Sequence, residues 1–164
     1  MNTITREQAG ELLAYDPGTG KFTWLKPPAG AHRVTAFSIA GCIRRDGYRV
    51  IGLHSRDYKA HRLAFLLMTG AWPAGQVDHI NGDRADNRWS NLRDVRPAVN
   101  RQNLRRATAG SKTGLLGATP DCGRYRAQIE LNGQAQYLGL FDTAEAAHAA
   151  YLKAKRQRHQ GNTL

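Results

Sequence analysis

The stretch VDHINGDRADNRWSNLRDV, residues 77–95, decides how the rest of the chain is interpreted. It contains four aspartates, three asparagines, three arginines and one histidine, with little apolar content between them. A segment so rich in side-chain oxygens is either a solvated turn, in which Asn and Asp satisfy their own backbone, or a site that holds a ligand.

Asp78 and His79, adjacent after the apolar Val77, favour a site. Neighbouring side chains of a strand point to opposite faces, but at a strand end or a bulge both can address one site. A carboxylate can hold a hard cation such as Mg²⁺, and a neutral imidazole, with an ordinary pKa of about 6.5, can accept a proton from water. A metal ion and a base together are the minimum requirement for phosphodiester hydrolysis.

A longer stretch resembles the HNH (His-Asn-His) nucleases of phage and homing-endonuclease type. The resemblance rests on DHINGDRADNRWSNLRDVRPAVNRQN at 78–103 and on HRLAFLLMTGAWP at 61–73, and it covers roughly residues 60–105. The co-occurrence of Asp-His, Asp-Asn, Asn-Leu-Arg and a later Asn is more specific than any one pair. The resemblance implies a ββα-metal fold, with two short strands, a loop between them and a following helix.

The resemblance also implies a role for four residues. Asp78 and Asn100 are expected to bind one divalent ion, Mg²⁺ or alternatively Mn²⁺, and His79 to act as the general base that activates water. Asn91 is expected on the second strand, where a hydrogen bond would orient the His79 ring. Hydrolysis would then leave 5′-phosphate and 3′-hydroxyl ends.

Other polar residues in this region have competing interpretations. Asp83, Asp86 and Asn87 are interpreted as ordinary turn residues. His61 is interpreted either as a phosphate contact or part of the active-site wall, or as a residue that caps or packs the apolar helix that it begins. Arg62, Arg84, Arg88 and Arg93 are predicted to contact the DNA backbone near the cut, although arginines on loops are often only solvated. A calcium loop is excluded because no D-x-[DN]-x-[DN]-G run with a closing Glu occurs.

The segments around this motif predict a mixed α and β arrangement. Thr5 and Gln8 have the spacing of a capping box, which predicts a helix over 4–14. A strand is expected from Phe22, and two short strands around the turn HSRD at 54–57. The other helices are expected at 61–72, ending near Gly70, and at 95–106.

The C-terminal segment predicts a small sheet with one helix. GRYRAQIEL (123–131) and QAQYLGLF (134–141) alternate as strands joined by Asn-Gly, and the helix that follows has Asp142 as its expected N-cap. Residues 114–162 resemble the plant ethylene-response-factor (APETALA-type) DNA-binding domain, whose three-stranded antiparallel sheet lies in the major groove. The sheet face expected to contact DNA carries Arg124, Arg126 and Gln128, and the opposite face is expected to pack on the helix around Ala146, Ala149 and Ala150.

Composition indicates the class of partner. The formal net charge is +11 and the pI is near 10.3, which favours a polyanion, with double-stranded DNA as the first expectation. Cys42 and Cys122 have no CxxC partner and are expected to be reduced and structural. With no apolar run of membrane-spanning length and no signal peptide, the chain is expected in the cytoplasm of a bacterium or an infected host, and not secreted.

These observations predict an α+β protein: a ββα-metal (HNH) nuclease module followed by a small three-stranded antiparallel sheet with one helix. The predicted parts are a mixed α/β region (1–60), the nuclease core (61–105), a linker (106–113) and the DNA-binding module (114–164). The predicted function is metal-dependent DNA cleavage. An inactive DNA-binding regulator and an RNA-binding structural protein are the alternatives, and the sequence leaves open whether the protein is a monomer or a dimer.

Overall fold

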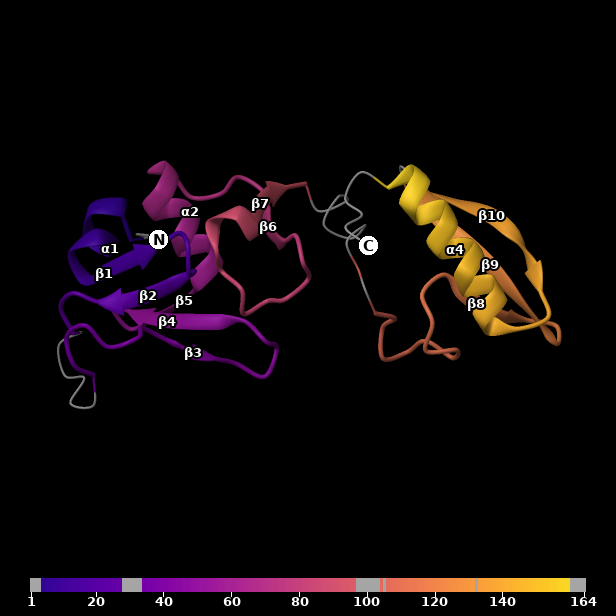
Figure 1. The fold of residues 1–164 in the computed structure, drawn as a ribbon, viewed down its shortest axis with the longest axis horizontal. Helices are drawn as coiled ribbons and strands as arrows, with labels where there is room; N and C mark the ends of the chain where they lie inside the picture. Colours follow the sequence, from indigo (N-terminus) through magenta and orange to yellow (C-terminus); the bar gives the residue numbers. More distant parts are fainter. Residues whose placement is uncertain (1–3, 28–33, 97–103, 105, 132, 160–164) are drawn as a thin grey trace. The chain divides into compact units, whose positions relative to one another are not determined.

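The computed structural model describes residues 4–27, 34–96, 104, 106–131 and 133–159. The chain divides into two compact units, residues 1–95 and 96–164 (Figure 1). Each is a mixture of helices and small antiparallel sheets, as predicted, and the described helices include none long and apolar enough to cross a membrane. The predicted boundaries of the nuclease core and the linker stay predictions, and the helix expected over 95–106 falls largely outside the described residues.

Within its described residues, the first unit contains three small sheets and two α-helices (Figure 1). The sheets are β1 with β2, β3 with β4 and β5, and β6 with β7, and every pairing is antiparallel. The elements in chain order are α1 (Arg6–Leu12), β1 (Leu13–Asp16), β2 (Lys21–Trp24), β3 (Cys42–Ile43), β4 (Arg49–Leu53), β5 (Arg56–Lys59), α2 (Ala60–Thr69), β6 (Gln76–His79), the 3₁₀ helix η1 (Trp89–Asn91) and β7 (Leu92–Val95).

The first helix begins as predicted but ends earlier than predicted. The Gln8 N–H donates to the Thr5 hydroxyl and the Thr5 N–H to the Gln8 amide oxygen, which completes the capping box. Leu13 leaves the helix because it pairs with Trp24 in the β1–β2 hairpin. Pairing of this strand therefore overrides helix propensity at the last two residues of the predicted helix.

The β4–β5 hairpin and the helix α2 agree with the predictions from sequence. His54 and Ser55 turn the chain with positive φ angles of 48° and 60°. Gly70 ends α2 in the left-handed conformation (φ 81°), and its N–H donates to the Leu66 carbonyl. Apolar side chains of α1, α2, β1, β2 and β4 meet in one core, whose fully buried members include Phe22, Ile51, Leu53 and Leu63.

The described part of the second unit is a three-stranded antiparallel sheet backed by one helix, as predicted (Figure 1). The strands are β8 (Ala118–Asp121), β9 (Arg124–Leu131) and β10 (Gln134–Phe141), with β9 in the centre, and the helix is α4 (Ala144–Arg158). Along β9 the side chains alternate, with Ala127 and Ile129 buried and Gln128 exposed, which confirms the predicted two faces of the strand.

Two predictions about this unit, and one about the two cysteines of the chain, are wrong in detail. Thr143, not Asp142, caps α4, because the Thr143 hydroxyl accepts from the Ala146 N–H and Asp142 instead pairs with Arg124. Ala146 and Ala149, which were expected to pack on the sheet, are exposed, whereas Ala147 and Ala150 pack in the core. Both cysteines are exposed free thiols and not structural core residues.

Candidate active site

The motif lies on the β6–β7 hairpin, and His79 is the last residue of β6. In the register of this pair Asp78 faces Arg93 and His79 faces Leu92. Asp78 and His79 are both buried, at 7% and 3% exposure. Burying a carboxylate and an imidazole costs free energy unless hydrogen bonds or opposite charges compensate for the lost water. The contacts of these two side chains therefore define the site.

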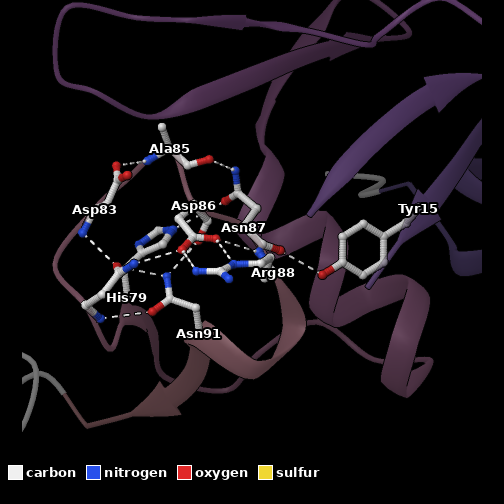
Figure 2. A network of polar contacts seen from close by, with 9 residues as sticks. Tyr15, His79, Asp83, Ala85, Asp86, Asn87, Arg88 and Asn91 are labelled. Carbon is white, nitrogen blue, oxygen red and sulfur yellow. Dashed lines mark hydrogen bonds and ion pairs between the residues drawn. The ribbon is translucent and has the colours of Figure 1, made fainter. Parts of the chain in front are cut away.

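The loop after β6 is built from a chain of short turns (Figure 2). Side-chain oxygens accept from backbone N–H groups two residues further on: Asn81 from Asp83 at 2.8 Å, Asp83 from Ala85 at 2.9 Å, and Asp86 from Arg88 at 3.3 Å. This geometry agrees with the interpretation of Asp83 and Asp86 as turn residues. Hydrogen bonds from the Arg88 guanidinium lower the pKa of Asp86 to about 2, so this carboxylate stays charged.

Asn91 closes this loop. Its amide oxygen accepts from the Asn81 N–H at 2.9 Å, and its amide nitrogen donates to the Asn81 side chain at 3.0 Å and to the Asp86 carbonyl at 2.8 Å. Asn91 lies in η1 and not on the second strand, which corrects the prediction. The described contacts make Asn91 an organiser of the loop backbone, and its assigned role in orienting His79 stays a prediction.

Asn87 is the asparagine that contacts the His79 ring. Its side chain is 1% exposed, and its amide oxygen lies 3.3 Å from His79 Nε2 (Figure 2). The Asn87 amide nitrogen donates to the Ala85 carbonyl at 3.0 Å. The interpretation of Asn87 as an ordinary turn residue was therefore wrong. Its neighbours in sequence are genuine turn residues, and only the path of the loop points this one inward.

The Asn87 contact selects one tautomer of His79. Because the amide nitrogen of Asn87 is used on Ala85, its oxygen faces the imidazole, and an acceptor opposite Nε2 requires the proton there. The lone pair of the neutral ring is then on Nδ1. This nitrogen is the one suited to take a proton from water.

The N-terminal hairpin supports Asn87 from behind, a role the sequence did not indicate. The Tyr15 hydroxyl donates to the Asn87 carbonyl at 2.8 Å (Figure 2), and burial raises the pKa of Tyr15 to about 12, so the phenol keeps its proton. Gly20, with φ of 70°, approaches so closely that a β-carbon there would lie 2.3 Å from the Arg88 nitrogen. The β1–β2 hairpin thus fixes the backbone that carries the His79 partner.

His61 and Tyr48 pack against His79 on another side. The His61 ring, 4% exposed, stands edge to face with His79 at a centroid distance of 5.1 Å. Tyr48 lies 5.1 Å from His61 and 5.9 Å from His79. Of the two interpretations of His61, packing in the wall of the site is the one the described contacts support.

Burial lowers the pKa of both histidines. The pKa of His61 falls to about 3, chiefly through burial, with further lowering from His79, Lys59 and Arg62. Burial also lowers the pKa of His79. The hydrogen bond that its ring donates to the Asn87 oxygen, and the nearby Asp78, Asp83 and Asp86, act in the opposite direction. Both rings are therefore neutral near neutral pH, the state in which a histidine can act as a base.

We expect the first unit to lose stability as the pH falls from about 6.5 towards 4.5. In this range the unfolded chain binds a proton at His61 while the folded chain does not, so the free energy of unfolding drops by up to about 1.4 kcal/mol per pH unit. His61→Phe should flatten this slope, whereas His54→Asn on the exposed turn should leave it unchanged. All three tryptophans lie in residues 1–95, so urea unfolding followed by tryptophan fluorescence reports this unit alone. An equal slope in wild type and His61→Phe would contradict the assignment.

The other predicted site residues of this unit make contacts within the protein. Arg93 donates through Nε and Nη2 to Asp78 Oδ2 at 3.0 and 2.7 Å. Arg62 donates to the Gly75 carbonyl at 3.3 Å and lies over the Trp72 ring. Contact of either arginine with DNA stays a prediction. Asn100 lies outside the described residues, which contain no group of three or more His, Cys, Asp or Glu able to hold a metal ion.

The predicted contact residues of the second unit share an exposed sheet face. Arg124 pairs with Asp142 at 2.9 Å, and Arg126 donates to Asp121 at 2.6 and 3.0 Å. Gln128 is exposed on the same face of β9. Both arginines are thus neutralised by carboxylates in the described structure, and DNA would have to replace these partners.

Comparisons with known proteins match part of this chain. Residues 58–102 match the model of a family described as HNH endonuclease, so the chain contains an HNH endonuclease domain in this segment. The chain is also similar to a solved structure described as "DNA binding and cleavage by the HNH homing endonuclease I-HmuI", with 26% identity and a TM-score of 0.44. That match covers 56% of this chain and 51% of the other, so it spans about half the length of that protein. No curated protein matches the chain.

Proposed function

We propose that the chain, through the HNH endonuclease domain at residues 58–102, hydrolyses phosphodiester bonds of double-stranded DNA. The observation that carries this proposal is the buried His79 at the end of β6, neutral and held by Asn87 in one tautomer, directly after the buried Asp78. Such a histidine can accept a proton from the attacking water, and the surrounding rings of Tyr48 and His61 limit its rotation.

A divalent ion, Mg²⁺ or Mn²⁺, fits the donor chemistry of this site. Asp78 presents a buried carboxylate that already balances one cation, the Arg93 guanidinium, and hard cations prefer carboxylate and amide oxygens. Asp78 and the predicted Asn100 would hold the ion, which supplies stabilisation of charge on the leaving oxygen. Arg93 would then share Asp78 with the ion or release it. A ββα-metal fold also needs a helix after β7. We propose that helix over 95–106, a segment that lies largely outside the described residues.

The second unit is proposed to bind the same duplex. Its three-stranded sheet with one helix has the architecture that the resemblance to APETALA-type domains implies, and Arg124, Arg126 and Gln128 lie on the exposed face of β9. Two linked modules on one duplex raise each other's effective concentration. The role is that of a phage or mobile-element nuclease acting in the cytoplasm.

The proposed function is tested with supercoiled plasmid and phage genomic DNA, incubated with the protein in Mg²⁺ or Mn²⁺ and in EDTA. We expect nicked or linear products only with the metal, and retarded complexes in gel-shift assays under both conditions. The product form shows whether one strand or both are cut. Binding without cleavage in any divalent ion would replace this proposal with the DNA-binding regulator, and absence of duplex binding would remove both.

A further inference from the structure

Two exposed cations beside the site have no carboxylate partner. Near His79, the Arg88 guanidinium pairs with Asp86 and the Arg93 guanidinium pairs with Asp78. Lys59 and Arg84 are also exposed, but among the described residues neither forms an ion pair. Their charges are therefore available to an anion from outside the protein.

Both cations are held on the same aromatic ring. Lys59 Nζ lies 3.8 Å from the centroid of Tyr48, and Arg84 Cζ lies 5.0 Å from it. Cation–π contacts of this kind bias the positions of these two long side chains. Tyr48 also contacts the rings of His61 and His79, so the pair of charges stands next to the proposed base.

Backbone contacts add order to this arrangement. Arg84 Nη1 donates to the Asp46 carbonyl at 2.9 Å, which ties the loop after β6 to the turn between β3 and β4. Lys59 is the residue before the first turn of α2, a helix with no side-chain cap and no acidic residue in that turn. The partial positive charge of this helix N-terminus therefore adds to that of Lys59 instead of being cancelled.

We propose that Lys59 and Arg84, held by Tyr48, form a subsite for a DNA backbone phosphate adjacent to the one that is cut. This inference rests on the proposed function. Two cations held on one ring beside a general base suit a phosphodiester, whose negative charge is shared over two oxygens. The subsite positions the duplex so that the scissile phosphate lies at His79, and it takes no part in proton transfer.

The test compares the double variant Lys59→Ala/Arg84→Ala with the matched control Arg6→Ala/Lys21→Ala. The control also removes two positive charges, one arginine and one lysine, from exposed positions of the first unit. These positions make no described ring contact with Tyr48, His61 or His79. Single-turnover cleavage is measured against duplex concentration, and binding is measured against salt. We expect the subsite variant to raise the half-saturating concentration about tenfold, with a smaller change in the maximal rate. Its slope of log binding constant against log salt should fall by about 1, as for one lost phosphate contact.

Further variants separate a subsite from general charge loss. Tyr48→Leu should raise the half-saturating concentration as the double variant does, and Tyr48→Phe, which keeps the ring, should restore it. Equal effects of the subsite and control variants would overturn the inference, as would single-stranded RNA competing as well as duplex DNA. If the wild-type protein binds but does not cut, the proposed function fails, while the salt slopes still decide whether the subsite exists.

Discussion

His79→Ala will reduce cleavage of duplex DNA by about 10²–10⁴-fold while leaving duplex binding within about threefold of wild type. The substitution removes the proposed base, the imidazole that the hydrogen bond from Nε2 to Asn87 leaves with its lone pair on Nδ1. Binding persists because the cationic residues of both units remain. Single-turnover cleavage in saturating Mg²⁺ and gel shift of the same samples measure the two effects separately.

His54→Asn is the control for this variant. His54 lies on the exposed turn between β4 and β5 with a φ of 48°, a conformation that asparagine tolerates. Its cleavage rate should match wild type. Tryptophan fluorescence should show that His79→Ala keeps its fold, and His79→Gln provides a second variant with less lost volume. A fully folded His79→Ala protein that cuts at the wild-type rate would exclude His79 as the base.

Asn87→Ala should slow cleavage by about 10–100-fold, the usual effect of removing the group that orients a functional histidine. Without the Asn87 oxygen, the ring loses the acceptor opposite Nε2 and spends part of its time in the unproductive tautomer. Asn87→Asp keeps an acceptor opposite Nε2 and adds a negative charge, which favours the protonated ring and raises the pKa of His79. Its rate should approach wild type at alkaline pH and decline at a higher pH than wild type as the solution is acidified.

Asn91→Ala distinguishes orientation of the base from organisation of the loop. It deletes three hydrogen bonds to Asn81 and Asp86, so the main expected effect is a loss of stability of about 1–3 kcal/mol. Urea unfolding and single-turnover cleavage at low temperature measure the two effects. If Asn91→Ala slows cleavage more than Asn87→Ala while remaining equally stable, then Asn91 and not Asn87 orients the base.

The sequence was sufficient where local chemistry dominates. Thr5 and Gln8 predict their capping box. Gly70 predicts the end of its helix, because glycine adopts the left-handed conformation found there without strain. The alternating residues of β9 likewise predict its buried and exposed faces, since a strand repeats every two residues. Predictions of helix ends failed by a residue or two where neighbouring residues compete for the same role, as Thr143 and Asp142 do for the N-cap of α4.

The sequence by itself singled out Asp78 and His79 as the proposed chemical centre of the first unit, because their types and the surrounding motif do not depend on how the loop folds. The tertiary structure decided which asparagine serves the imidazole. Asn87 and Asn91 are chemically identical, and their positions follow from a loop closed by its own side chains and supported by Tyr15 and Gly20, more than sixty residues earlier in the chain. Such long-range contacts leave no periodic signal in the sequence, so only the assembled fold could place the pair of cations on Tyr48 as well.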